Sequence, residues 1–238
     1  MATAAVVDMA GSTIVGGLVQ ENYWSSTIVV KFDSSGNKLW EFRAGSGNFG
    51  GVEALAVDKL GNVFLSSRTP SEALPARVLV KLDPDGRELW HIVQKHASGN
   101  PTYASTSSVA VDDSGNVFHL GLVRRSTSDV EFCWTVAVAK YSAAGRRRWL
   151  TTLPDCDYGL PLGGIAQAMA VLPDGSLAIV GWRNGGFAAK LDAGGRLLWL
   201  KVASVIACQP GPFSSVLVNN RGAICAGEIG RASCRERV

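Results

Sequence analysis

Short apolar runs alternate along the chain with polar turns that contain glycine, and two phrases of this form recur. The first phrase carries a lysine before its turn and ends on tryptophan: VVKFDSSGNKLW, VLVKLDPDGRELW, VAVAKYSAAGRRRW and FAAKLDAGGRLLW. Its copies end at spacings of 50, 59 and 50 residues, on Trp40, Trp90, Trp149 and Trp199. An apolar run on each side of a tight turn predicts a β-hairpin.

The second phrase interleaves with the first and reads VDMAGSTIVGG, LAVDKLGNVFLSS, VAVDDSGNVFHLG, MAVLPDGSLAIVG and VLVNNRGAICAG. Its turn glycines are 50, 54, 60 and 47 residues apart, at Gly11, Gly61, Gly115, Gly175 and Gly222. One repeat is therefore two hairpins, or four strands, in roughly 50 residues. A four-stranded unit with this period predicts the blade of a β-propeller.

The turns of both phrases share one chemistry. Asp or Asn three residues before the glycine can accept hydrogen bonds from the turn backbone, while glycine takes the positive φ. These residues are Asp8, Asp58, Asp112 and Asn219 in one phrase and Asp33, Asp83 and Asp192 in the other, with Leu172 and Ser142 as the exceptions.

The predicted fold is an all-β propeller, incomplete, with about four and a half blades of four antiparallel strands each. The predicted blades are residues 1–44, 45–95, 96–153 and 154–204, followed by a partial one at 205–227. A hydrophobic content of 47% fits sheets that are covered on both faces. Because one repeat cannot bury its own faces, we expect a single domain.

Both phrases together resemble the bacterial SBBP-type repeats of seven-bladed β-propellers, whose units read approximately AVDxxGNVYVxG followed by VxKxDxxGxxxW. The resemblance covers residues 4 to 227, with Tyr141 and Ser142 departing from the usual Leu-Asp. It implies the fold and a bacterial, extracytoplasmic setting: secreted, cell-surface or periplasmic. The family shares no catalytic residues that could be carried over.

The last residues, 228–238, break the repeat and read EIGRASCRERV. This string resembles a translated sequencing adapter, and the alternative is a natural basic tail. We leave it out of the fold, so the chain is expected to stop inside a blade. No signal peptide precedes the first strand, and the localisation therefore depends on the resemblance alone.

Charge and cysteine content limit the partners. A net charge of +3 offers no concentrated basic face for nucleic acid, and no apolar stretch approaches the roughly 18 residues of a membrane span. Cys156 and Cys208 fall on equivalent loops of neighbouring repeats, a placement that allows a disulfide. No cysteine or histidine spacing predicts a zinc site, and we expect neither a metal nor a cofactor.

Antiparallel meanders place all the tight turns at one end of the strands, which we call the turn side, and the longer connections at the other, the loop side. Function is expected on the loop side, and we predict a protein or glycan ligand there. Its candidate aromatic residues either recognise this ligand or cover the seams between blades: Tyr23, Trp24, Phe49, Tyr103, Trp134, Tyr158 and Trp182.

Residues that recur in phase are expected to assemble the blades. The four phrase-ending tryptophans are assigned to packing between blades, and Lys31, Lys81, Lys140 and Lys190 recur five residues before their turn glycine. In the Lys-x-Asp copies, alternation places both side chains on one strand face, which predicts an ion pair between them.

The sequence favours a binding scaffold over an enzyme. It contains no GxSxG elbow, P-loop, GxGxxG before a helix or HExxH motif. The alternative is a fragment of a quinoprotein (pyrroloquinoline quinone) dehydrogenase, whose docking segment AxDxxTGxxxW resembles the tryptophan phrase. Here the Asp stands seven residues before the Trp instead of eight, and the Thr is missing.

Overall fold

The computed structural model describes ten stretches of the chain: residues 1–21, 24–44, 50–69, 76–94, 106–126, 132–154, 165–182, 186–202, 215–218 and 224–227. They contain β-strands and no helix. Consecutive strands form sheets A to D of four strands each and a hairpin E of two. Every sheet falls within one of the residue ranges predicted for a blade.

The strands of sheets A and B are β1 (Ala2–Val7), β2 (Thr13–Glu21), β3 (Trp24–Phe32), β4 (Lys38–Arg43), β5 (Ala54–Val57), β6 (Val63–Arg68), β7 (Arg77–Leu82) and β8 (Glu88–Gln94). Sheets C and D and the hairpin contain β9 (Thr106–Val111), β10 (Val117–Ser126), β11 (Phe132–Tyr141), β12 (Arg147–Thr152), β13 (Ile165–Val171), β14 (Leu177–Trp182), β15 (Gly186–Leu191), β16 (Leu197–Val202), β17 (Ser215–Val218) and β18 (Ile224–Gly227).

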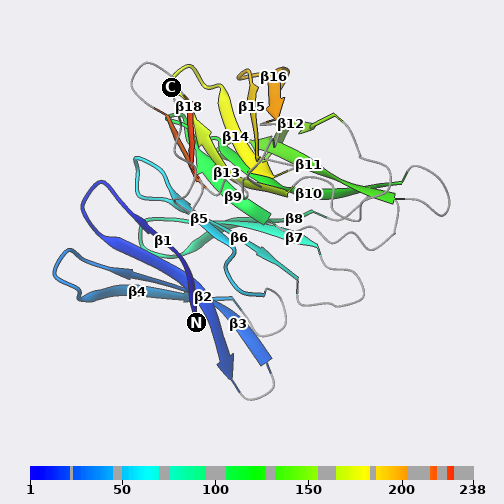
Figure 1. Cartoon of the computed structure of the whole chain (residues 1–238). Helices are drawn as coiled ribbons and strands as arrows, with labels where there is room; N and C mark the ends of the chain where they lie inside the picture. The colour runs from blue at the N-terminus through cyan, green and yellow to red at the C-terminus, as the bar shows by residue number, and fades with distance from the viewer. Residues whose placement is uncertain are drawn as a thin grey trace, which may run out of the picture. The chain divides into compact units, whose positions relative to one another are not determined.

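Each sheet is an antiparallel meander whose strands follow chain order (Figure 1). The chain divides into two compact units, residues 1–124 with 137–150, and residues 125–136 with 151–238. In the first unit, β5 contacts β1 of the preceding sheet and β9 of the following one. In the second unit, β13 contacts β17. Within each unit, the first strands of successive sheets therefore lie together, as in a stack of blades.

The turn chemistry predicted from the sequence is confirmed. Eight turn glycines have φ between 73° and 88°, which only glycine adopts without strain. The Asp58 carboxylate is typical of the Asp turns: it accepts hydrogen bonds from the backbone N–H groups of Leu60 and Asn62. The two exceptions substitute other acceptors, since Ser142 accepts from Arg146, and Asp174 accepts from Ser176 in the turn that begins at Leu172.

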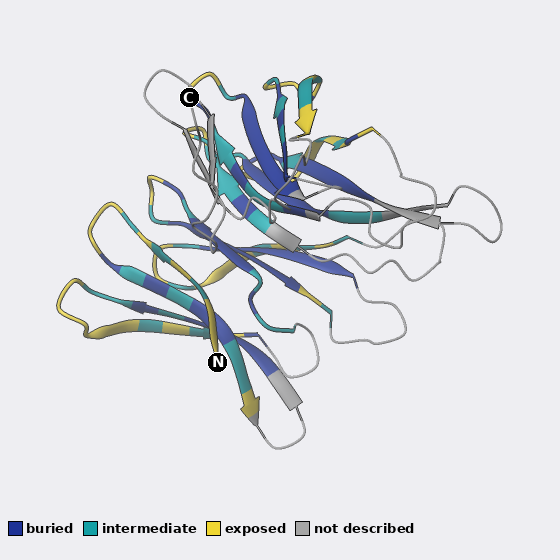
Figure 2. Ribbon diagram, in the orientation of Figure 1, coloured by how far each residue is buried: buried dark blue, intermediate teal, exposed yellow. Residues whose placement is uncertain are grey.

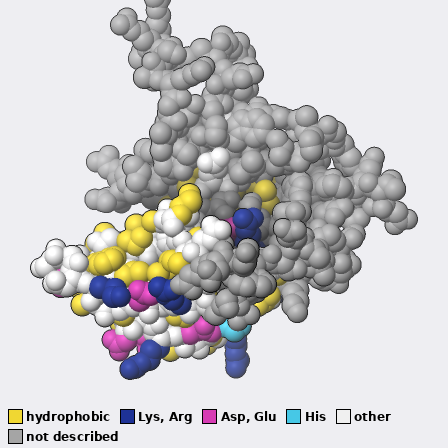
Figure 3. Space-filling view, turned by 90° about the horizontal axis from the view of Figure 1, so that it is seen from below, with side chains coloured by type: hydrophobic (Ala, Val, Ile, Leu, Met, Phe, Trp, Pro, Cys, Tyr) yellow, Lys and Arg dark blue, Asp and Glu magenta, His cyan; other side chains and the backbone are white. Residues whose placement is uncertain are grey.

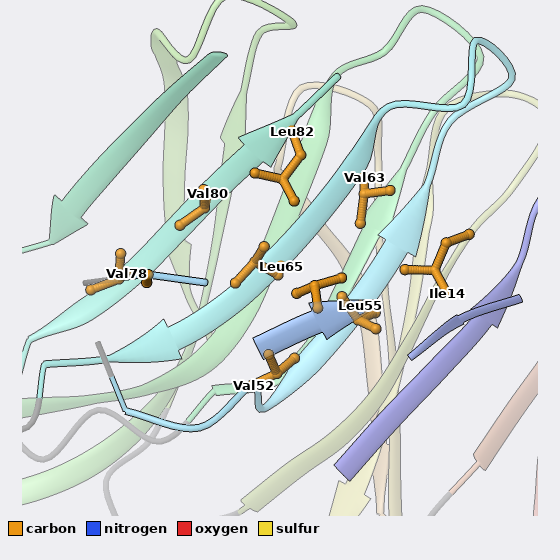
Figure 4. Packing of buried hydrophobic residues seen from close by; sticks show 10 residues of the cluster. Ile14, Val52, Leu55, Val63, Leu65, Val78, Val80 and Leu82 are labelled. Carbon is orange, nitrogen blue, oxygen red and sulfur yellow. The ribbon is translucent and has the colours of Figure 1, made fainter. Parts of the chain in front are cut away.

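Two apolar seams hold sheets A, B and C together. The first seam joins sheet A to sheet B through Ile14, Val29, Leu55, Leu65 and Val80 (Figure 4). The second seam joins sheet B to sheet C, with Phe64, Leu79, Val117 and Ala139 among its residues. Strand β7 supplies both seams from alternate faces.

Burial follows from this stacking. Val78, Leu79 and Val80 are all 0% exposed, which confirms that β7 is covered on both faces. The buried segments lie within the strands, and the turn-side tips are mostly exposed (Figure 2). Sheet B therefore has the environment of an interior blade.

Candidate functional site

The phrase-ending tryptophans of sheets A and B each contact the next sheet on the turn side. The Trp40 indole Nε1 donates a hydrogen bond to the Pro84 carbonyl (2.8 Å), and the Trp90 Nε1 donates to the Ala143 carbonyl (3.1 Å). Trp149 lies beside Phe118, with ring centroids 6.0 Å apart. Trp199 pairs with Lys190 in the β15–β16 ladder.

The prediction of an ion pair within each Lys-x-Asp was wrong. Lys31 instead lies 2.9 Å from Asp8, at the end of β1 in the same sheet. Asp33 uses its carboxylate to accept hydrogen bonds from Ser35 and Asn37 in its own turn. Asp8 accepts backbone hydrogen bonds from its own turn in the same way, through Oδ1, and its Oδ2 is the atom that contacts Lys31.

Two of the other three in-phase lysines also lie close to an aspartate of a neighbouring turn in the same sheet. Lys140 lies 3.2 Å from Asp112, and Lys190 lies 3.9 Å from Asp174; both partners are turn aspartates of the second phrase. Lys81 differs, since it donates to the Ala143 carbonyl of the next sheet (3.2 Å). These contacts link strands or sheets on the turn side.

The aromatic residues predicted for the loop side lie outside what the structure describes. Tyr23, Phe49, Tyr103 and Tyr158 belong to undescribed connections, and for Trp24, Trp134 and Trp182 only the backbone is described. Those backbones do fall near the loop-side ends of β3, β11 and β14. Cys156 and Cys208 are also outside the described residues.

A buried polar cluster lies in the second seam, and sequence reasoning missed it. His119, 0% exposed in β10, is bonded through both ring nitrogens. Its Nε2 lies 2.8 Å from the Ser66 hydroxyl, and its Nδ1 lies 2.9 Å from the Gln94 amide nitrogen. We call Ser66, Arg77, Gln94, His119 and Tyr141 the second-seam polar cluster.

Arg77 is the charged member of this cluster. Its side chain begins at the loop-side end of β7, and the residue is only 4% exposed. Burial lowers the pKa of the guanidinium to about 10, against the opposing influence of Tyr141 and Glu53, so it remains protonated at neutral pH. Its Nη1 is buried and has no hydrogen-bond partner within the described part of the chain.

The histidine and the tyrosine of the cluster are neutral at pH 7. Burial, followed by the positive charge of Arg77, holds the pKa of His119 well below its usual 6.5. Burial raises the pKa of Tyr141, although Arg77 and Arg147 act in the other direction. Arg77 is therefore the one positive charge among the five members.

The cluster departs from the repeat at every position. Counted from the turn glycine, the lysine or the tryptophan of each phrase, the positions of Ser66, Arg77, Gln94, His119 and Tyr141 are occupied one repeat earlier by Gly16, Thr27, Ala44, Leu65 and Leu82. Two of these first-seam positions are tightly packed or already hydrogen-bonded. A Cβ on Gly16 would lie 2.8 Å from Val52, and the Thr27 hydroxyl donates to the Gly50 carbonyl.

Sheet C returns to apolar residues. The equivalents of Ser66, Arg77 and Gln94 are there Leu120, Val136 and Leu153, each at most 5% exposed. The signal was present in the sequence: aligning the repeats column by column separates the conserved scaffold positions from polar residues that occur in one seam.

The described residues contain neither a metal-ligand cluster nor a long apolar helix. Within these stretches, no three His, Cys, Asp or Glu side chains gather in a way that could hold a metal ion. No helix long and apolar enough to cross a membrane occurs in the described parts of the chain.

Comparisons with known proteins identify the fold. No family model matches the chain, and no curated protein matches it either. A protein of unknown function from Dyadobacter fermentans is similar with a TM-score of 0.56 and 12% identity, over 84% of this chain and 68% of that one. An endo-arabinase from Bacteroides thetaiotaomicron has a TM-score of 0.51 and 14% identity, over 94% and 87%.

A third similar structure is a mutant apocarotenoid oxygenase from Synechocystis, with a TM-score of 0.50 and 10% identity. It is matched over 86% of this chain, which spans 50% of that protein's length. The chain has a propeller-type fold. At such identities the likeness concerns the fold alone, so the function must be argued from this chain's own residues.

Proposed function

We propose that this chain is a non-enzymatic propeller scaffold of the SBBP repeat type that binds a protein or a glycan on its loop side. The proposal includes a bacterial, extracytoplasmic location, which the sequence resemblance suggests. The activities of the arabinase and the oxygenase belong to those proteins and are not transferred.

The second-seam polar cluster is the observation that carries this proposal. On the turn side the repeats keep nearly the same chemistry, because turn glycines, tryptophans and lysines serve assembly. In the second seam, five positions of sheets B and C that the first seam fills with small or apolar residues and one threonine are polar instead. Buried polar groups and an unpaired cation cost stability, so their presence favours a role beyond packing.

The loop-side aromatics remain the proposed contact residues. Tyr, Trp and Phe side chains stack on sugar rings or anchor a protein partner, and both uses need them on a rigid scaffold. Trp24 is the first residue of strand β3, and Trp134 is the third residue of strand β11. Each tryptophan is therefore held by a strand of a four-stranded sheet.

A glycan array probed with the whole chain, beside a pull-down from the medium of a related bacterium, tests the proposal. Trp24→Ala and Trp134→Ala are expected to weaken binding at least tenfold, whereas Trp199→Phe serves as a turn-side control and keeps it. Binding that is unchanged in both loop-side variants, or absent from both assays, contradicts the proposal. A redox spectrum after reconstitution with pyrroloquinoline quinone tests the dehydrogenase alternative.

A further inference from the structure

Positive charge exceeds negative charge where strands β6 and β7 reach the loop side. Arg68 and Arg77 are directly opposite each other in the ladder. Arg68 is exposed and lies 3.6 Å from Glu53, and the same Glu53 carboxylate also acts on Arg77 from a greater distance. Among the residues described here, two guanidinium groups thus share one carboxylate, which leaves one positive charge without a counter-charge.

The directions of the hydrogen bonds in the cluster also favour an anionic ligand, because they leave one proton donor available. The Gln94 amide nitrogen donates to His119 Nδ1, so the neutral ring carries its proton on Nε2 and donates it to the Ser66 oxygen. The Ser66 hydroxyl proton is then available to another acceptor. Ser66 is opposite Leu79, two residues from Arg77, so the hydroxyl and the guanidinium are diagonal neighbours on one sheet face.

The Arg77 Nη1 therefore faces the second seam without a hydrogen-bond partner among the described residues, and it lies near a Ser66 hydroxyl whose oxygen is bonded to His119. A buried guanidinium of this kind is stable only when an anion or several acceptors satisfy it. A single carboxylate matches the site in charge, and its two oxygens match the planar fork of an arginine.

We propose that the second seam binds the carboxylate of an acidic sugar residue, with Arg77 as the anchoring cation and Ser66 as a second donor. The inference depends on the proposed function and narrows its ligand to a uronate-containing glycan. A sugar acid fits better than an acidic peptide because the groups around Arg77 are a hydroxyl, an amide and a phenol, a polar surrounding that suits the hydroxyl groups of a sugar ring. A peptide side chain would present methylene groups to them.

The test measures the melting temperature of the whole chain with and without galacturonate, galactose, inorganic phosphate and a Glu-containing peptide. Galacturonate is expected to raise the melting temperature, with no shift from galactose at the same concentration. Arg77→Met should abolish the galacturonate shift. Because it removes an unpaired buried charge, it should also leave the ligand-free protein as stable as before or more stable.

Arg87→Met is the matched control, because this substitution removes the same charge from an exposed position in a turn. It should keep the galacturonate shift. The inference is overturned if galacturonate produces no shift, if phosphate or the peptide stabilises the protein and galacturonate does not, or if the shift survives in Arg77→Met. A ligand-free Arg77→Met protein that melts well below the wild type also overturns it, since Arg77 would then be structural.

These outcomes separate the inference from the proposed function. A protein that binds neutral glycans or a protein partner through Trp24 and Trp134, and ignores galacturonate, keeps the scaffold function and loses the carboxylate site. A galacturonate shift that depends on Arg77 but not on either tryptophan keeps the carboxylate site and contradicts the proposed role of the aromatic residues.

Discussion

Trp40 and Gly86 are in contact across the first seam. A Cβ placed on Gly86 would lie 2.7 Å from two carbons of the Trp40 ring, while the indole Nε1 of that ring donates to the carbonyl of Pro84 in the same turn. The second seam repeats the arrangement, with Trp90 beside Gly145 and bonded to Ala143. The tryptophan of one repeat thus covers the turn of the next.

Replacing Trp40 by Phe removes the indole donor and keeps an aromatic ring in the seam. We expect the free energy of unfolding to fall by about 1 kcal/mol, because the Pro84 carbonyl loses this hydrogen bond. Trp90→Phe should cost less, since the Ala143 carbonyl also accepts from Lys81. Urea denaturation of both variants measures the difference. Equal losses, or a larger loss for Trp90→Phe, would contradict this description of the seams.

Lys31 and Asp8 form a nearly buried ion pair, with side chains 10% and 5% exposed. Lys31→Met is expected to cost about 3 kcal/mol of unfolding free energy, because it leaves the carboxylate buried without its cation. Adding Asp8→Asn should recover most of this loss. Lys38→Met, which breaks an exposed pair with Glu41, is the control and should cost less than about 1 kcal/mol. If Lys31→Met and Lys38→Met prove equally mild, the pair has no structural role.

His119 should make stability depend on pH. Its pKa is lowered in the folded protein by burial and by Arg77, so below 6.5 the unfolded chain binds a proton that the folded chain does not. The unfolding free energy should therefore be highest above pH 6.5 and fall by up to about 1.4 kcal/mol per pH unit as the pH drops toward the folded pKa. This fall continues until the folded pKa is reached.

His119→Gln keeps hydrogen-bonding capacity and cannot titrate, so it should flatten this dependence between pH 6.5 and 5. His91→Gln, at a half-exposed position in β8, serves as the control substitution. Chemical denaturation at several pH values provides the measurement. A wild-type slope that persists in His119→Gln would assign it to other groups.

The face of sheet A that points away from sheet B is apolar and incompletely covered. Val7 is 63% exposed, and Val15 and Val30 are partly exposed, whereas the equivalents of the latter two in sheet B, Leu65 and Val80, are fully buried. Hydrophobic side chains also gather in a band beside charged ones in the view of Figure 3. Such a face favours association with another apolar surface.

We therefore expect the 238-residue chain to self-associate at micromolar concentrations in sedimentation velocity. Val15→Lys should shift the distribution toward the monomer, because it places a charge in the middle of this face. Leu60→Lys changes an exposed turn residue outside the face and should have no effect. A sharp monomer peak for the wild type contradicts the expectation.

Much of the fold could be predicted from the sequence because its determinants are local and repeated. The turn glycines, the aspartates before them and the flanking apolar runs specify each hairpin, and the period specifies that the hairpins stack. The partner of Lys31 was mispredicted because alternation along one strand shows only which face of the sheet the lysine side chain takes. It does not show which carboxylate on that face lies within reach of the lysine.

The second-seam polar cluster could not be assembled from the sequence pattern alone. Ser66, Arg77, Gln94 and His119 lie on four strands of two sheets, and only the stacking brings them together. His119 in particular resembles any residue of an apolar run until the partners of its two ring nitrogens are known. A comparison of the repeats shows that these positions are unusually polar, and the structure shows that their side chains meet in one seam.

The substitutions Gly86→Ala and Gly36→Ala test the stacking of repeats most directly. Both glycines have nearly the same positive φ, 82° and 84°, but Gly36 has nothing within 4 Å of its Cβ position, whereas Gly86 faces the Trp40 ring. Gly36→Ala should cost about 1 kcal/mol of unfolding free energy for the backbone alone. If tryptophans cover the next repeat's turns, Gly86→Ala should cost about 1–3 kcal/mol more, because the ring must move. Equal losses in the two variants would contradict that account.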